Sequence, residues 1–188
     1  MSINTRSTDI AGIHFRVIAP RTTPVPTLHR PALDIVVTVH NQEQELARAV
    51  RRLRSFLRHP FPFSAQITIA DCASTDSTRD VATALGGIRL IHLNGEARGR
   101  ALAAAWMTSD ARVVATAEVD PEIDVSSLSR LIAPVMSGHS EISIFGRLKA
   151  VRGDVARRLI PTVLHRNWLF ETELLLRARR AGMRIHAA

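Results

Sequence analysis

The sequence predicts an α/β fold with a mostly parallel sheet and helices on both faces. Apolar runs rich in Val and Ile alternate with amphipathic helical patterns along most of its 188 residues, which is typical of βαβ units. The strand-like runs are 33–39, 66–70, 88–93, 112–118 and 141–145. The helical patterns cover 42–58, 77–85, 100–108, 126–136, 153–160 and 171–181. Several of the strand-like runs end in polar or acidic residues, so these groups should gather at one edge of the sheet.

Local signals mark where the elements begin and end. After strand 33–39, Asn41 can cap the helix over 42–58, and Leu46, Val50 and Leu53 recur at helical spacing on one face of that helix. Prolines in the loop HPFPF stop it. A Gly-Gly pair ends the helix over 77–85, and Gly138 ends the helix over 126–136.

The chain divides into an N-terminal arm and one domain. Residues 1–31 are polar and carry several prolines, so we expect an extended or disordered arm there. Residues 32–188 are long enough to form a single domain with a sizeable core. The lone Cys72 excludes an internal disulfide, and no apolar run is long enough to span a bilayer. We therefore expect a cytoplasmic protein, either soluble or peripheral to the inner face of the plasma membrane.

The formal net charge is +8, and nearly all of the positive charge is arginine, because Lys149 is the only lysine. A basic balance can attract nucleic acid, anionic lipid or phosphorylated small molecules. The arginines of 48–58 suit either a solvated helix face or a surface that docks on lipid head groups. No aromatic residues are interleaved with the basic ones, which argues against nucleic acid as a partner.

The polar groups at the strand ends suit a nucleotide, a metal ion and a phosphorylated substrate. They are Asn41, Asp71, Asp76, Glu118 and Asp120. Glu118 and Asp120 are two apart at a strand end, so both carboxylates can face one Mg²⁺ or Mn²⁺ ion. Asp76 also fits a plain helix cap, and for Asp71 a structural and a functional role are equally open.

The loop over 96–100 precedes a helix, where backbone N–H groups and guanidinium groups can hold a diphosphate. Arg98 and Arg100 are the guanidinium candidates in this loop. The loop lacks a P-loop signature, so this motif carries little weight by itself.

Seven segments then carry a family resemblance. They are VVTVHNQEQEL, DCASTDST, ARGRALAAAW, AEVD, SGHSEISIFGRL, KAVRGDVARRLIP and FETELLLRARRAGMRIH, in that order. They resemble the P-x-Y-N-E, D-[DN]-x-S-T-D, G-[KR]-G-x-A-L, D-x-D, G-S-R, G-F-K-A-x-R and F-D-T-E-L-L segments of family 2 glycosyltransferases. The resemblance is to the polyprenyl-phosphate branch, which is similar to dolichyl-phosphate-mannose synthase, and to its actinobacterial type. It implies the Rossmann-like GT-A fold from about Leu33 onward.

The resemblance also implies a reaction and roles for particular residues. A nucleotide-diphosphate sugar would be the donor, a polyprenyl phosphate lipid the acceptor, and Mg²⁺ or Mn²⁺ the cofactor. By this resemblance Asp71 contacts the base, and Glu118 with Asp120 binds the metal and diphosphate. Asp120 and Glu173 are then the catalytic candidates. The substrate-binding candidates are Asn41, Asp71, Asp76, Arg98, Arg100 and Arg147.

Departures from the family pattern leave a second hypothesis open. Cys72 stands where the family has a second Asp or Asn, and Glu118 stands for the first Asp of D-x-D. Between Leu148 and Lys149 the chain lacks a segment of a few tens of residues that helps to form the acceptor side in the family. The alternative to a transferase is therefore a non-catalytic paralogue that binds nucleotide and has a regulatory role.

Overall fold

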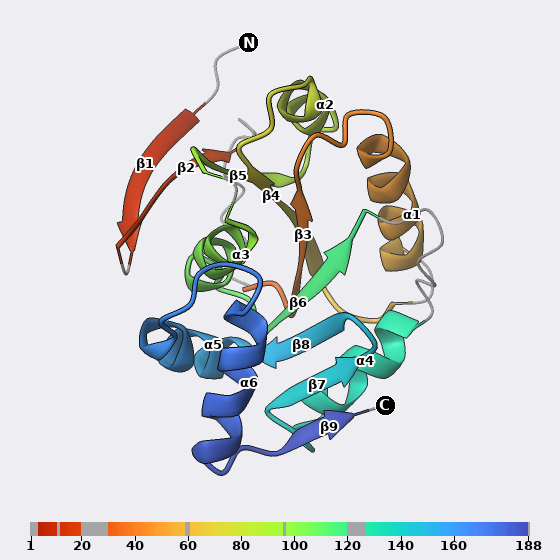
Figure 1. Cartoon of the computed structure of the whole chain (residues 1–188). Coiled ribbons are helices and arrows are strands. Elements are labelled where there is room, and N and C mark those ends of the chain that lie inside the picture. The colour runs from red at the N-terminus through yellow and green to blue at the C-terminus, as the bar shows by residue number, and fades with distance from the viewer. Residues whose placement is uncertain are drawn as a thin grey trace.

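The computed structural model describes residues 4–10, 12–19, 30–58, 61–95, 97–119 and 127–187. Within these ranges nine strands form one sheet in the order β1-β2-β5-β4-β3-β6-β8-β7-β9 (Figure 1). The strands are β1 (Asn4–Ile10), β2 (Ile13–Ala19), β3 (Leu33–Val39), β4 (Ala65–Cys72), β5 (Arg89–Leu93), β6 (Val113–Glu118), β7 (Ile142–Phe145), β8 (Leu148–Arg152) and β9 (Ile185–Ala187).

The middle of the sheet is parallel and its flanks contain antiparallel pairs. Strands β5, β4, β3 and β6 run in one direction, as the strand–helix alternation predicted. Strand β2 is antiparallel to β5 on one side, and β8 is antiparallel to β6 and β7 on the other. Polar residues that follow the four parallel strands therefore lie at one edge of the sheet.

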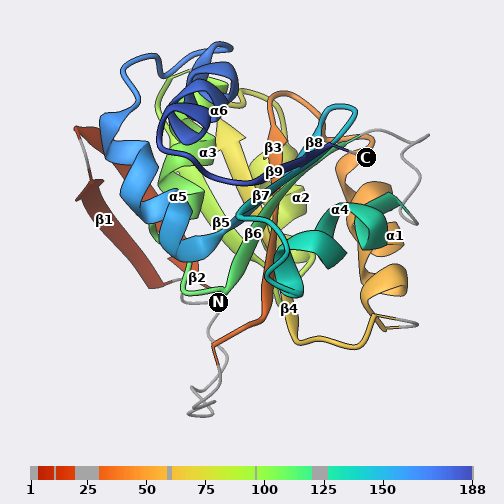
Figure 2. The same ribbon diagram turned by 90° about the horizontal axis from the view of Figure 1, so that it is seen from below.

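Helices cover both faces, as expected (Figure 2). They are α1 (Leu46–Arg58), α2 (Thr78–Ala84), α3 (Arg98–Met107), α4 (Ser127–Met136), α5 (Gly153–Leu159) and α6 (Phe170–Arg180), with a 3₁₀ turn, η1 (Ile160–Thr162). One core packs α3, α5 and α6 against the sheet, and the other packs α1, α2 and α4 against the opposite face. No helix of the described ranges is both long and apolar enough to cross a bilayer.

Strand β3 shows how sequence alternation divides the two cores. Val36 faces the α3 side, whereas Ile35 and Val37 face the α1 side. All seven residues of β3 are buried, because it lies at the centre of the sheet with helices on both faces. Because β3 pairs with both β4 and β6, the residues at the ends of these two strands lie at nearly the same height along the sheet.

A carboxylate is buried in the sheet near the start of β3. The side chain of Asp34 has no exposed surface. It accepts hydrogen bonds from Gln66 Nε2 at 2.7 Å, Thr68 Oγ1 at 2.8 Å and Ser109 Oγ at 2.7 Å. Arg89 Nη2 lies 3.4 Å from Asp34 Oδ2, and burial lowers the pKa of Arg89 while Asp34 raises it. Asp34 thus joins β3, β4, β5 and the residues after α3.

The N-terminal segment differs from the arm that the sequence predicted. Residues 4–10 and 13–19 form a hairpin, β1–β2, and β2 extends the sheet beside β5. Ile13 and Phe15 are buried against α3 and α5, which explains why the hairpin docks. The expected arm over 1–31 is therefore wrong for the hairpin. Residues 1–3 and 20–29 lie outside the described ranges.

A tight turn joins β7 to β8, just before the position between Leu148 and Lys149 where the sequence was expected to lack a family segment. Phe145 and Leu148 pair across the hairpin, so only Gly146 and Arg147 form the loop. Gly146 has φ of 56°, the left-handed conformation that glycine adopts readily at the first position of such a turn. The connection between β7 and β8 therefore consists of two residues, and Arg147 lies at the tip of the turn.

Candidate functional site

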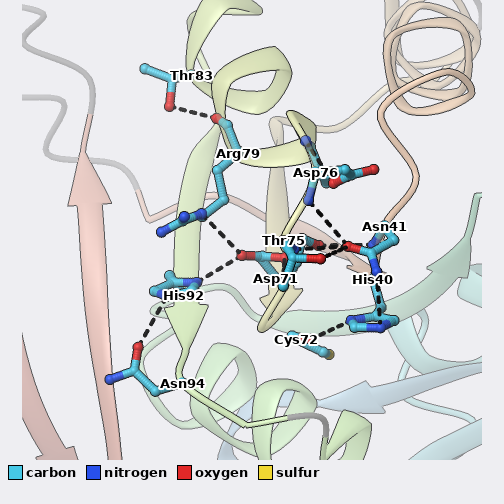
Figure 3. Close-up of polar contacts among 12 residues, drawn as sticks. His40, Asn41, Asp71, Cys72, Thr75, Asp76, Arg79, Thr83, His92 and Asn94 are labelled. Atoms are coloured by element: carbon cyan, nitrogen blue, oxygen red, sulfur yellow. Dashed lines mark hydrogen bonds and ion pairs between the residues drawn. The ribbon is translucent and has the colours of Figure 1, made fainter.

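The β3–α1 and β4–α2 loops are joined by Asn41, which has φ of 50° (Figure 3). Its backbone N–H donates to Ser74 Oγ at 2.9 Å. Its Oδ1 accepts from the backbone N–H of Thr75 at 2.8 Å. Beside it, His40 Nδ1 donates to the carbonyl oxygen of Cys72 at 2.7 Å. Asn41 therefore shapes the loops, and its expected contact with substrate stays a prediction.

The carboxylates of Glu43 and Asp76 strengthen the same junction, because each accepts a hydrogen bond from a backbone N–H of the other loop. The N–H of Glu43 donates to Asp76 Oδ2 at 3.2 Å, and the N–H of Ser77 donates to Glu43 Oε2 at 2.7 Å. Asp76 Oδ1 also accepts from the N–H of Thr78, the first residue of α2, at 3.0 Å. Burial raises the pKa of Asp76, but hydrogen bonds from Thr78 and Glu43 outweigh it and hold that pKa below its ordinary value. Asp76 thus binds the first N–H of α2 from the residue before the N-cap, Ser77, and its expected contact with substrate stays a prediction.

Asp71 lies at the end of β4 with its carboxylate fully buried. Oδ2 is 2.7 Å from Nδ1 of His92 on β5, and Oδ1 accepts from the N–H of Ser74 at 3.2 Å. The guanidinium of Arg79 reaches 4.0 Å from Oδ2, and His92 Nε2 contacts Asn94 Oδ1 at 3.1 Å (Figure 3). Both oxygens of Asp71 are engaged within the protein. His92 was not among the predicted site residues, although it is the residue that pairs with Asp71 across β4 and β5.

A second group of polar residues lies across the same edge, around Glu118 at the end of β6. Five charged side chains form the charge cluster: Arg98, Glu118, Arg147, Lys149 and Glu171. Arg98 Nη1 donates to Glu118 Oε1 at 2.8 Å, and Arg147 Nη2 is 2.7 Å from Glu118 Oε2. Lys149 Nζ is 3.2 Å from Glu171 Oε1, and Arg98 Nη2 is 3.9 Å from Glu171 Oε2. The charge cluster thus extends from the β7–β8 turn to the start of α6.

The sequence predicted three members of this cluster and missed two. Arg98, Glu118 and Arg147 were candidates, and the structure brings them together. Lys149 and Glu171 were not candidates, yet only 15% and 18% of their side chains are exposed. One signal was available for Lys149, because it is the only lysine in an arginine-rich chain.

The carboxylate of Glu118, with the contacts that it makes in this structure, is not suited to bind a metal ion. Each of its oxygens already accepts from a guanidinium group, so a divalent cation there would lie close to two fixed positive charges. Two like unit charges 4 Å apart repel by about 4 kcal/mol at an effective dielectric of 20. The described part of the chain has no group of three or more His, Cys, Asp or Glu side chains that could hold a metal ion. Asp120, the other expected ligand, lies outside the described residues.

Arg100 and Glu173, two further candidates, make no ion pair with the charge cluster among the residues that the structure describes. Burial lowers the pKa of Arg166, and the charge of Arg100 lowers it further, whereas Glu173 raises it. Glu173 accepts from the backbone N–H groups of Leu164 at 3.0 Å and His165 at 2.8 Å. Arg177 Nε donates to it at 2.8 Å. Glu173 therefore anchors the loop before α6, and its catalytic role stays a prediction.

The Glu173 contacts predict a pH-dependent stability. Burial raises its pKa, but the hydrogen bonds from His165, Leu164 and Arg177 outweigh this and lower it to about 2. The folded pKa is below the unfolded one, so the stabilisation is present above about pH 4.5 and is lost as pH falls towards 2. We expect Glu173→Gln to unfold more readily than wild type at pH 6 and to show a smaller loss of unfolding free energy between pH 5 and about pH 2.5.

Urea unfolding at several pH values measures this effect. Glu45→Gln, at an exposed glutamate before α1, is the matched control and should follow the wild-type curve. A Glu173→Gln curve parallel to wild type over the whole acid range would contradict the proposed anchoring.

A small hollow of about 100 Å³ adjoins the charge cluster. The first turn of α3 and the segment 167–171 line it. Gly99 permits their close approach, since a Cβ atom there would lie 2.4 Å from Asn167 O and 2.6 Å from Phe170 Cβ. Trp168 lies at the hollow with 77% of its surface exposed, and Leu164, in the same loop, is 78% exposed. An acceptor at this place would therefore meet both charge and apolar surface.

Comparison with known proteins identifies the family. Residues 34–186 match the model of glycosyl transferase family 2, and the chain belongs to that family. Its GT-A architecture agrees with the expectation from the sequence motifs. A search of curated proteins finds no match.

Solved structures of two further proteins share the fold. Glucosyl-3-phosphoglycerate synthase from Mycobacterium tuberculosis, in complex with Mn²⁺, UDP and glucosyl-3-phosphoglycerate, superposes with a TM-score of 0.66 at 16% identity. The match covers 84% of this chain and 69% of that one. S. aureus TarS (residues 1–349) superposes with a TM-score of 0.62 at 16% identity, over 83% of this chain and 57% of that one. At these identities the likeness supports the fold and no particular substrate.

Proposed function

We propose that this protein binds a nucleotide-diphosphate sugar at the carboxyl edge of β3–β6 and transfers the sugar to a phosphorylated acceptor. The observation that carries the proposal is the charge cluster at this edge, in a chain of glycosyl transferase family 2. In parallel α/β sheets ligands bind beyond the carboxyl ends of the strands. The M. tuberculosis relative, of the same fold, has been crystallised with UDP-glucose and phosphoglyceric acid.

The two polar groups at the edge suit the two halves of such a donor. Thr38 on β3 pairs with Glu118, whereas Val39 pairs with Asp71, so the two acidic residues flank one strand at nearly one level. Two strand spacings separate them by roughly 10 Å. We place the nucleoside beside Arg79 and the Asp71 loops, and the diphosphate at Arg98.

Transfer requires one bond to break and one to form. The bond between the anomeric carbon and the diphosphate oxygen breaks, and the nucleotide diphosphate leaves with the electron pair. An oxygen of the acceptor phosphate forms the new bond to that carbon. An ionised phosphate needs no strong general base, so the protein contributes mainly by positioning and by stabilising the leaving charge. Asp120 and Glu173 stay the catalytic candidates that the family resemblance implies.

For the acceptor we propose a polyprenyl phosphate, with the protein peripheral to the inner face of the plasma membrane. Exposed Trp168 at the hollow beside the charge cluster, with exposed Leu164 in the same loop, supports an acceptor with an apolar part. Exposed Arg48, Arg51 and Arg58 on α1 suit anionic lipid. If Mg²⁺ or Mn²⁺ takes part, Asp120 and phosphate oxygens would have to hold it, because Glu118 is already paired with arginine.

Release of nucleotide diphosphate tests the function. The purified protein would be incubated with UDP- and GDP-sugars, with Mg²⁺, Mn²⁺ or EDTA, and with a short polyprenyl phosphate or 3-phosphoglycerate. We expect release that depends on the polyprenyl phosphate and falls by at least about 100-fold in Arg98→Gln, where a donor to the leaving diphosphate is lost. The same release with 3-phosphoglycerate alone would replace the lipid acceptor by a soluble one.

A second candidate function is nucleotide binding without turnover. The β7–β8 hairpin favours it, because β8 runs without interruption through Leu148 and Lys149, between which the family resemblance places an acceptor-side segment. Saturable binding of UDP or GDP with no release from any donor and acceptor pair would establish this alternative. Absence of both binding and release would contradict both functions.

A further inference from the structure

The charge cluster contains more cations than carboxylates. Among the residues that the structure describes, Arg98, Arg147 and Lys149 form ion pairs only with Glu118 and Glu171, so this described cluster has an excess positive charge. Four of the five side chains are 36% exposed or less, which reduces the screening of these charges by solvent. Such a site favours an anion and disfavours a divalent cation.

The cations also have hydrogen-bonding capacity that the protein does not use. Arg98 Nε is buried and has no hydrogen-bond partner among the described residues. Arg147 pairs with Glu118 from the tip of the β7–β8 turn, where 77% of its side chain is exposed. An exposed ion pair contributes little stability, so Arg147 can exchange its partner at small cost. A guanidinium group offers a planar fork of donors that matches phosphate oxygens.

The position of Arg98 adds a second source of positive potential. Arg98 is the first residue of α3, a helix of ten residues. No acidic side chain lies in its first turn, and its N-cap residue, Ala97, offers no side-chain oxygen to the free N–H groups. The positive end of the helix dipole therefore lies next to the guanidinium groups without a capping carboxylate of its own turn.

We propose that Arg98, Arg147 and Lys149 neutralise the diphosphate of the donor, and that no divalent cation binds at Glu118. This inference rests on the proposed function, since it describes how the same site holds the donor. In the free protein Glu118 holds the two guanidinium groups in place. When the diphosphate binds, Arg147 moves from Glu118 to a phosphate oxygen, and Arg98 stays between Glu118 and the ligand.

Calorimetric titration with UDP, GDP and inorganic pyrophosphate, each with EDTA and with Mn²⁺, tests the inference. We expect at least one of the three to bind in EDTA with a Kd within about threefold of the Kd in Mn²⁺. Arg147→Gln should weaken that binding by about tenfold, the loss expected for one charge-assisted hydrogen bond. Arg184→Gln is the matched control, because it removes another exposed arginine whose ion pair, with Glu141, has the same 2.7 Å length.

Glu118→Gln separates the two ways of neutralising the diphosphate. With arginine neutralisation, the variant frees both guanidinium groups and should tighten binding in EDTA by threefold or more. With a metal at Glu118, it removes a ligand and should weaken binding in Mn²⁺. The melting temperature of each variant shows that it is folded.

Two results would overturn the inference, and they differ from each other. Binding that appears only with Mn²⁺, and is weakened in Glu118→Gln, would reject it and leave the proposed function intact. No binding of any of the three probes in either condition would reject the proposed function together with the inference.

Discussion

Asp34→Ala should lower the free energy of unfolding by about 3–5 kcal/mol, the cost of removing one partner of a buried ion pair. Asp34 is fully buried and accepts from three neutral side chains besides its contact with Arg89. Without it, the guanidinium of Arg89 loses its partner carboxylate while only 19% of that side chain is exposed. Thermal and urea unfolding at pH 7 measure the change.

A control for this prediction comes from an exposed ion pair. Asp9 pairs with His14 at 3.2 Å in the β1–β2 hairpin, and 70% of its side chain is exposed. Asp9→Ala should alter the unfolding free energy by less than about 1 kcal/mol. Equal losses in the two variants would show that burial of Asp34 has no special weight.

Gly99→Ala should destabilise the protein by about 1–3 kcal/mol and weaken nucleotide binding. Its new Cβ would meet backbone atoms, Asn167 O at 2.4 Å and Arg166 C at 2.8 Å, so no side-chain rotation relieves the contact. The segment before α6 must move away from α3. Because that segment leads directly to Glu171, the change should also separate Glu171 from Arg98. Thermal melting and UDP or GDP titration measure the two effects.

Gly95→Ala is the matched control in the same loop region. A Cβ at Gly95 meets no atom within 4 Å, and its φ lies outside the left-handed region that excludes a side chain. Alanine there should therefore be neutral or slightly stabilising, since it restricts the unfolded chain. A Gly99→Ala protein as stable as Gly95→Ala would contradict the close packing of α3 on the segment 166–170.

The parallel centre of the fold could be predicted from sequence because its signals are local. Strand 33–39 was predicted with the bounds that β3 has, since seven consecutive buried residues have no polar interruption except Asp34 and Thr38. The predicted parallel direction also placed Asp71 and Glu118 at one edge of the sheet. Both residues lie there, at the ends of β4 and β6.

The flanking strands could not be predicted as easily, because their stability depends on partners far away in sequence. Strand β2 carries a two-residue alternation, with Ile13 and Phe15 inward, but the nearby prolines favoured an arm instead. Strand β8 has only five residues and follows a two-residue turn. Its pairing with β6 is visible only when the sheet has formed.

The interaction partners of the site residues also could not be predicted from the sequence. Glu118 was expected to face a divalent metal ion. In the structure its carboxylate faces the guanidinium groups of Arg98 and Arg147. Which positive group reaches a carboxylate depends on the β7–β8 turn and on the start of α3, which lie far from Glu118 in sequence. Glu171 and Glu173 are two apart on α6, so they face different sides of the helix, and only geometry tells them apart.

The β7–β8 turn also bears on how chains of this family can differ in length. Phe145 and Leu148 close the hairpin at the sheet rim, so extra residues inserted between Gly146 and Arg147 would leave the ladder below unchanged. Each doubling of a flexible loop costs only about 0.6 kcal/mol in closure entropy. Lengthening this two-residue turn to about 30 residues, roughly four doublings, would therefore cost about 2–3 kcal/mol. A turn of different length can thus alter the rim of the sheet beside Glu118 while the parallel centre of the sheet remains as it is.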